Sequence, residues 1–277
     1  MARVVHPVEL PNGVTLQYVE QGDSSGIPVM LLHGATDSWR SFEPVLPHLP
    51  SSLRAFALTQ RGHGDASRPP YGYRYADFAA DLAAVMDVLG LESAVIVGHS
   101  MGRAIAQRFA IDYPERTLGL VLVGAFAGEA HNPAVVEIEE AVSTQVDPID
   151  AGFAREFQLS TLAKPVPPAF LETAVEESRK VPVRVWREVF ARIREDDVAA
   201  ELGEIRARTL VITGDRDGFA APDEVEARAQ SVADARLVVY HGAGHALHWE
   251  EPVRFATDLI AFAEDLKSRS DPRTPAA

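Results

Sequence analysis

The chain has 277 residues, of which 47% are hydrophobic and 24% are charged, and this composition is typical of a globular α/β protein rather than of a long disordered segment. Its 26 Lys and Arg against 40 Asp and Glu give a formal net charge of −14, which disfavours nucleic acids and anionic membranes as partners and favours a small neutral molecule. Because the chain has no cysteine, a disulfide framework, a thiolate metal site and a cysteine nucleophile are excluded.

Neither a signal peptide nor a membrane-spanning segment is predicted. Residues 1–7 contain no apolar stretch, and no uninterrupted apolar run approaches the length needed to cross a bilayer. We therefore expect a cytoplasmic protein that acts on a small molecule and has no nucleic-acid or membrane partner. The sequence does not indicate an oligomeric state.

The first half of the chain alternates apolar runs with amphipathic segments. Residues 14–19 alternate as in an antiparallel strand, and residues 4–10 can pair with them across the Asn12-Gly13 turn. Strands buried on both faces of a parallel sheet are predicted at residues 29–32, 54–58, 94–97 and 118–123. Helices are predicted at residues 38–49, 75–89 and 101–113.

The second half begins with helices alone. They are predicted at residues 133–146, 151–163, 168–180 and 183–194. Strands and helices then alternate again, at 209–213, 223–232, 236–240 and 251–267, before a polar tail from 268 that we expect to be frayed. The predicted fold class is α/β: a mostly parallel sheet flanked by helices, formed by residues 1–126 and 204–277, with a helical cap inserted at 127–203.

Ser100 stands on the predicted turn between a buried strand and a helix. Gly98 and Gly102, two residues before and after it, allow a sharp turn that presents the hydroxyl at the end of the sheet. Gly-x-Ser-x-Gly alone also occurs in ordinary turns, but a strand before it and a helix after it are typical of a nucleophile. Ser100 is therefore the predicted nucleophile.

A serine alcohol needs a base and a group that orients the base. His245, in the Gly-Ala-Gly-His loop after a late strand, is the predicted base, and His248 is its nearest rival. Asp217 is the predicted orienting acid, because it lies further out on its loop than Asp215, which is better placed to fix the turn. Two other carboxylates stay open as alternatives: Asp223 and Glu129.

Acyl transfer also needs fixed donors for the negative charge that develops on the carbonyl oxygen. Two backbone N–H groups are predicted for this role. That of Met101 lies at the start of the helix after the nucleophile, and that of Ala35 follows His33-Gly34 at the end of a neighbouring strand. The scattered spacing of the histidines gives no metal signature.

These motifs together resemble a cap-bearing member of the α/β-hydrolase superfamily, in which serine, acid and histidine follow in this chain order. The resemblance covers nearly the whole chain. It implies that Ser100 attacks a carbonyl, His245 transfers the proton, Asp217 supports the histidine, and the Ala35 and Met101 amides hold the oxyanion. It implies neither a cofactor nor a metal.

Two residues depart from the family pattern, and two others are candidates for substrate contact. Arg103 stands where a small residue is usual, so it would crowd the turn or add positive charge near the site, and Gln60 stands where an acid is common.

The aromatic residues of the cap most simply form the apolar faces of its helices. Trp186 of the cap and Trp39 near the oxyanion turn are the predicted substrate contacts.

We expect a cofactor-independent serine hydrolase that cleaves a carboxylic ester or lactone of a small, neutral, fairly apolar substrate through an acyl-enzyme. One alternative keeps the triad in a carbon–carbon bond hydrolase or perhydrolase, whose anionic substrates would need an arginine such as Arg103, Arg184 or Arg187. Another is a ligand receptor with slow or no turnover. A serine at position 100, where an aspartate would form an alkyl-enzyme, argues against dehalogenation and epoxide opening.

Overall fold

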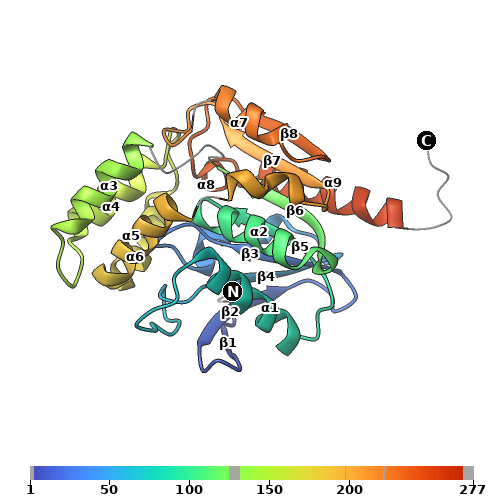
Figure 1. Cartoon of the computed structure of the whole chain (residues 1–277), viewed down its shortest axis with the longest axis horizontal. Helices are drawn as coiled ribbons and strands as arrows, with labels where there is room; N and C mark the ends of the chain where they lie inside the picture. Colours follow the sequence, from blue (N-terminus) through green and yellow to red (C-terminus); the bar gives the residue numbers. More distant parts are fainter. Residues whose placement is uncertain (1–2, 125–131, 197, 221, 271–277) are drawn as a thin grey trace.

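The structure, a computed structural model that describes residues 3–124, 132–196, 198–220 and 222–270, is organised around one sheet (Figure 1). In this part of the chain, eight strands follow the order β1-β2-β4-β3-β5-β6-β7-β8. Their bounds are β1 (His6–Glu9), β2 (Thr15–Gln21), β3 (Ile27–Leu32), β4 (Leu53–Thr59), β5 (Ala94–His99), β6 (Thr117–Val123), β7 (Thr209–Gly214) and β8 (Ala235–Tyr240). The predicted α/β fold class is confirmed.

The sheet is antiparallel at one edge and parallel elsewhere. Strands β1 and β2 form a hairpin, and β2 pairs antiparallel with β4. From β4 through β3, β5, β6 and β7 to β8 every pairing is parallel. Because the parallel strands run the same way, their carboxyl ends meet at one edge of the sheet, where α/β proteins bind their ligands.

The two faces of the sheet pack against different helices. Along β3, Met30 and Leu32 belong to the buried cluster that includes helices α1 and α2, whereas Val29 and Leu31 belong to the cluster that includes α9. This alternation is the period of two that a strand imposes on its side chains. The helices outside the insertion described below are α1 (Tyr75–Val88), α2 (Met101–Asp112), α7 (Pro222–Ala229), α8 (Leu247–Glu250) and α9 (Pro252–Ser270).

The helix predicted at 38–49 is wrong. Two short 3₁₀ turns occupy this segment instead, η1 (Trp39–Phe42) and η2 (Leu46–His48). Pro44 and Pro47 have no N–H to donate, so a continuous α-helical ladder cannot form across them. Pro47 is tolerated because it lies in the first turn of η2, where an N–H has no helical partner.

Within the described residues, four α-helices follow one another between β6 and β7, and we refer to residues 133–195 as the helical insertion. In Figure 1 they form a group beside the strand ends. Asn132 and Asp150 cap α3 and α4 by accepting hydrogen bonds from Ala134 and Phe153. The helices are α3 (Pro133–Ser143), α4 (Ala151–Ser160), α5 (Pro168–Lys180) and α6 (Val183–Glu195), with a 3₁₀ turn, η5 (Ala199–Glu204), before β7.

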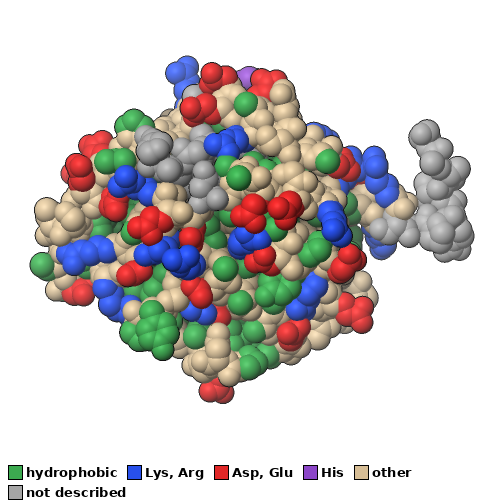
Figure 2. Space-filling view, viewed as in Figure 1, with side chains coloured by type: hydrophobic (Ala, Val, Ile, Leu, Met, Phe, Trp, Pro, Cys, Tyr) green, Lys and Arg blue, Asp and Glu red, His purple; other side chains and the backbone are tan. Residues whose placement is uncertain are grey.

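Acidic and basic side chains alternate over the helices on the face shown in Figure 2, and hydrophobic side chains are scattered among them. None of the helices in the described ranges is long and apolar enough to cross a membrane. The tail predicted to be frayed from 268 continues helix α9 as far as Ser270, and its remainder lies outside the described residues. So do Glu129, the alternative acid, and the predicted start of the cap at 127.

Candidate active site

Ser100 lies in a tight turn in which the residues two positions before and two positions after it have no room for a side chain. Ser100 joins β5 to α2 with φ 54° and ψ −119°, a strained conformation for a residue other than glycine. A Cβ on Gly98 would lie 2.1 Å from the Gly102 carbonyl oxygen, and one on Gly102 would lie 2.3 Å from that of Leu32. The two glycines therefore let the turn pack against its neighbours while the serine side chain faces a cavity.

The histidine and the aspartate of the predicted triad are in contact. His245 Nδ1 lies 2.9 Å from Asp217 Oδ2, and the other oxygen, Oδ1, accepts a hydrogen bond of 2.8 Å from the Phe219 N–H. The Asp217 side chain has no exposed surface and that of His245 only 6%. Because Asp217 holds the proton on Nδ1, Nε2 is left as the basic nitrogen of the ring.

The rival residues have other partners. Asp215 accepts hydrogen bonds from His241 Nδ1 and from the Gly242 N–H, so it fixes the turn after β8. His248 is fully buried against Ser41, with its Nε2 3.1 Å from the serine Oγ, and burial lowers the pKa of His248 to about 3. Asp223 is exposed in the first turn of α7.

Ala35 and Met101, whose backbone N–H groups are the predicted oxyanion donors, line the same cavity as Ser100. The Met101 N–H is at the first position of α2, where a backbone donor has no helical partner. The Ala35 N–H shares a peptide plane with the Gly34 carbonyl, which contacts His33 Nδ1 at 2.8 Å and the Asp37 N–H at 3.4 Å. Since the two groups of a trans peptide point in opposite directions, the Ala35 N–H is held away from these partners.

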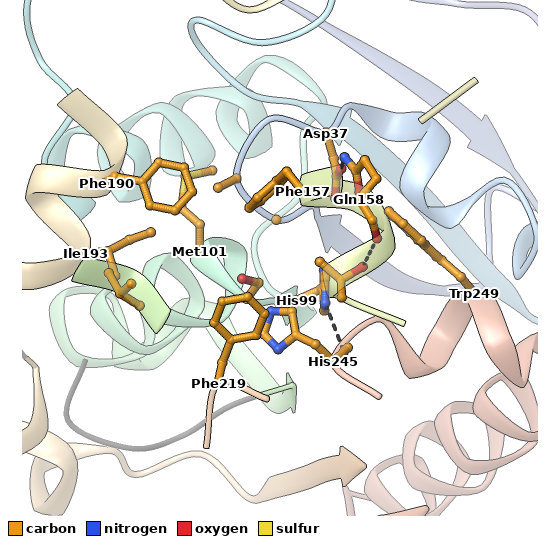
Figure 3. A pocket seen from close by; sticks show the side chains of 15 residues that line it. Asp37, His99, Met101, Phe157, Gln158, Phe190, Ile193, Phe219, His245 and Trp249 are labelled. Carbon is orange, nitrogen blue, oxygen red and sulfur yellow. Dashed lines mark hydrogen bonds between the residues drawn. The ribbon is translucent and has the colours of Figure 1, made fainter. Parts of the chain in front are cut away.

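The site lies in a small, mostly apolar cavity. The volume that the centre of a water molecule can occupy inside it is about 40 Å³. In Figure 3, Phe157 and Phe190 of the insertion lie across from Phe219 and His245 of the core. Phe157 and Phe219 also line a larger outer groove of about 350 Å³ between α3 and α4. The lining residues from the helical insertion are Val135, Phe157, Gln158, Thr161, Phe190 and Ile193.

Neither predicted tryptophan is among the described residues that line this cavity. Trp186 is fully buried inside the insertion, where it stacks on Phe190, and its indole N–H lies 3.3 Å from the Ser178 carbonyl. Trp39 is buried in the cluster on the α9 side of the sheet. A different tryptophan, Trp249 of α8, lines the cavity, and its indole N–H donates to the Ser41 carbonyl at 2.8 Å.

The two departures from the family pattern have structural partners. Gln60 donates its side-chain amide to the His33 carbonyl at 3.0 Å, and its backbone N–H donates to His33 Nε2 at 3.1 Å. Burial lowers the pKa of His33 well below its ordinary value, which fits a neutral ring that bridges Gly34 and Gln60. Arg103 is 4% exposed on α2 and donates to the Gln107 side chain at 2.9 Å.

Asp37 is a carboxyl group in this cavity that the sequence analysis did not single out, although it follows Ala35 by only two residues. It is 5% exposed, and its oxygens accept hydrogen bonds from Gln158 at 3.0 Å and Ser41 at 3.3 Å. Burial raises the pKa of Asp37 to about 7, although these hydrogen bonds and nearby His245 lower it. The site therefore holds, besides Asp217, a buried carboxyl group whose pKa is raised to about 7.

Asp37→Asn should stabilise the protein more at pH 8 than at pH 5. The folded chain holds the Asp37 proton up to about pH 7, whereas the unfolded chain releases it near the ordinary value of 3.8. The wild-type protein therefore loses unfolding free energy as the pH rises through this window, and the asparagine variant does not. We expect the difference between the two proteins to change by about 2–3 kcal/mol between pH 5 and 8 in urea unfolding.

The same substitution controls for the other charged groups around Asp37. His245 and Glu177 also act on the Asp37 carboxyl; both are present in the two proteins, so the comparison removes the part of their titration that is independent of Asp37 and retains their coupling to it. Any loss of hydrogen bonds to Ser41 and Gln158 would change the stability by the same amount at both pH values. An equal effect of the substitution at pH 5 and pH 8 would contradict the buried, proton-holding state of Asp37.

Known proteins are similar to this chain over most of its length. The sequence model of a family described as having the alpha/beta hydrolase fold matches residues 27–252. The chain is 30% identical, over 87% of its length and 91% of the relative's, to the 2-hydroxy-6-oxo-2,4-heptadienoate hydrolase of Pseudomonas putida. It is 28% identical to a non-heme haloperoxidase of Rhodococcus erythropolis, over 93% of this chain and 98% of that protein.

A solved structure supports the same placement. An esterase from Rhodococcus sp. ECU1013 superposes with a TM-score of 0.81 at 25% sequence identity, over 95% of this chain and 99% of that one. The similarity thus covers most of each matched chain rather than one motif.

Proposed function

Because this chain belongs to the alpha/beta hydrolase family, we propose that it is a serine hydrolase that cleaves a carboxylic ester or lactone of a small, neutral and fairly apolar substrate. The observation that carries the proposal is that Ser100 and His245 line the same cavity, while Asp217 Oδ2 lies within hydrogen-bond distance, 2.9 Å, of His245 Nδ1. Such an arrangement supplies an activated nucleophile and a base that is held in one tautomer.

In the proposed reaction, the Ser100 Oγ attacks the carbonyl carbon while His245 Nε2 removes its proton. The buried Asp217 carboxylate stabilises the imidazolium that forms. The Ala35 and Met101 N–H groups bind the oxyanion, and the histidine returns its proton to the leaving alcohol. Water then attacks the acyl-enzyme with the same base, which releases the acid and frees Ser100.

The lining of the cavity favours a neutral substrate. Among its described residues there is neither a lysine nor an arginine, and most of the side chains are apolar. Arg184 donates to the backbone carbonyls of Arg68 and Pro69, and Arg187 donates to those of Ser143 and Gln145. These arginines are engaged on the outside of the insertion, so an anionic substrate would meet no compensating charge from them.

A second candidate activity is hydrolysis of a carbon–carbon bond in a dienoic ketoacid. The observation in its favour is the similarity to the dienoate hydrolase of Pseudomonas putida along most of the chain. The same triad would serve, and the carboxylate of the substrate would then have to bind without the arginines discussed above. The similarity to the haloperoxidase of Rhodococcus erythropolis supports perhydrolysis in the same way.

The proposal is tested by labelling and by a substrate screen. A fluorophosphonate probe should modify Ser100, identified by mass spectrometry of its peptide, and p-nitrophenyl butyrate or a simple lactone should be hydrolysed. Faster turnover of a 2-hydroxy-6-oxodienoate than of any ester would support the carbon–carbon alternative. A folded protein that takes up no label and hydrolyses none of these substrates would contradict the proposal and favour the ligand-receptor alternative.

A further inference from the structure

The loop that carries the Ala35 N–H, residues 34–37, is strained and polar, and we call it the oxyanion loop. Thr36 has φ 69°, a left-handed conformation that β-branched residues rarely adopt and that persists only where the surroundings impose it. Thr36 and Asp37 are also nearly fully buried, with 1% and 5% exposure. Groups outside the loop must therefore supply the contacts that hold it.

Besides the hydrogen bond from Ser41 to Asp37, these contacts include hydroxyl and amide groups of the helical insertion. Ser178 of α5 lies 3.1 Å from Thr36, hydroxyl to hydroxyl. Gln158 of α4 donates one amide hydrogen to Asp37 Oδ1 at 3.0 Å and the other to Ser178 Oγ at 2.7 Å. Both hydrogens of the Gln158 amide are thus used, and all four side chains are buried together.

The contact with Asp37 acts directly on the proposed oxyanion donor. The Asp37 N–H approaches the Gly34 carbonyl at 3.4 Å, and the Gly34–Ala35 peptide plane carries the Ala35 N–H on its opposite side. A shift of Asp37 would rotate this plane and turn the donor away from the oxyanion. The hydrogen-bonding geometry needed at an oxyanion hole tolerates little displacement, because the donor must lie about 2.7–3.1 Å from the charged oxygen.

We propose that Gln158 and Ser178 are positioning residues through which the helical insertion holds the oxyanion loop in its working conformation. Ser178 does not contact the reacting atoms in this arrangement and is not among the described lining residues, so it acts through Thr36 and Gln158. The proposal rests on the proposed function, because it assigns the Ala35 N–H as a donor to the transition state. It adds that the insertion takes part in catalysis as well as in enclosing the substrate.

Ser178→Ala is the sharpest test, because it removes one hydroxyl without changing the lining of the cavity. We expect kcat for p-nitrophenyl butyrate to fall by about 10- to 100-fold, with KM within about twofold, as for a misplaced transition-state contact. An alkyl boronic acid, which forms an anionic tetrahedral adduct on the serine, should lose affinity in proportion to kcat/KM. Gln158→Met should give a similar loss of kcat, and the double variant little more, because the two side chains form one network.

The matched control is Thr173→Ala, which removes a hydroxyl from the same helix. Thr173 Oγ1 donates to the Ala169 carbonyl within α5, so its loss should leave kcat unchanged. Hydrogen–deuterium exchange of the peptide covering 33–41 supplies a readout that needs no substrate: exchange should rise in Ser178→Ala and not in Thr173→Ala, with β5 unchanged in both as a test of folding.

The outcomes separate the two claims. An unchanged kcat, or unchanged exchange at 33–41 in Ser178→Ala, would overturn the positioning role. A rise in KM with an unchanged kcat would overturn it as well, because it would indicate a distorted binding cavity. If the wild-type protein neither hydrolyses esters nor takes up the probe, the proposed function fails, and the exchange comparison alone then decides whether the insertion holds the loop.

Discussion

Replacing Ser100 with alanine should lower kcat for p-nitrophenyl butyrate by about 10⁴–10⁶-fold. The alanine removes the oxygen that would form the acyl-enzyme and leaves His245 and Asp217 with no nucleophile to activate. The residual rate would come from the oxyanion donors and from substrate binding alone. The unfolding free energy should change by less than about 1 kcal/mol, because the hydroxyl lies at a cavity and not in the packed core.

Ser160→Ala is the control for this experiment. Ser160 is exposed at the end of α4, and its hydroxyl donates to the Phe157 carbonyl, so its loss should leave kcat and probe labelling at wild-type values. Activity of Ser100→Ala within tenfold of the wild type would contradict the acyl-enzyme mechanism and the assignment of the nucleophile together.

Asp217→Asn should lower kcat by about 10⁴-fold without loss of folding. Asp217 Oδ1 accepts from the Phe219 N–H, so the asparagine would keep its carbonyl oxygen there and direct its NH₂ group at His245 Nδ1. The histidine would then accept at Nδ1 and carry its proton on Nε2, the nitrogen that must be free to take the proton from Ser100. Steady-state kinetics and the rate of fluorophosphonate labelling should fall in parallel.

The comparison with Asp215→Asn makes this test specific. Asp215 is the other acid on the same loop, and it holds His241 and the Gly242 N–H. Its replacement should change kcat by less than about threefold, since it acts on the turn and not on the base. A larger loss in Asp215→Asn than in Asp217→Asn would reassign the orienting acid.

Local patterns were sufficient for most of the fold. The β5 strand and the α5 helix follow directly from their apolar spacing, and the predicted range 168–180 matches the observed helix. The helix predicted at 38–49 is wrong because the apolar residues of this segment have a helical period, while Pro44 and Pro47 prevent the backbone from completing the hydrogen-bond ladder. The spacing of side chains indicates burial, but the backbone donors decide which helix forms.

The site could be predicted where its residues carry a local signature, and not where they depend on contacts between distant segments. Ser100 and its glycines form such a signature, and so does the small-residue loop before His245. Nothing near Gln158 indicates that its amide meets Asp37, 121 positions earlier in the chain. Trp186 is predicted to contact substrate because a cap must present apolar surface to the cavity, yet a large ring on an amphipathic helix is most often core, and Trp186 is buried within the insertion.

The order of strands in the sheet has a consequence for how this protein reaches its native state. Residues at the site come from the ends of β5, β7 and β8, and His99 meets the His245 carbonyl across 146 positions of sequence. Contacts of such long range form slowly, because their loop-closure entropy is not offset until the intervening strands have paired. During refolding, catalytic competence should therefore return after helical circular dichroism, which makes turnover a reporter of the last strands to join.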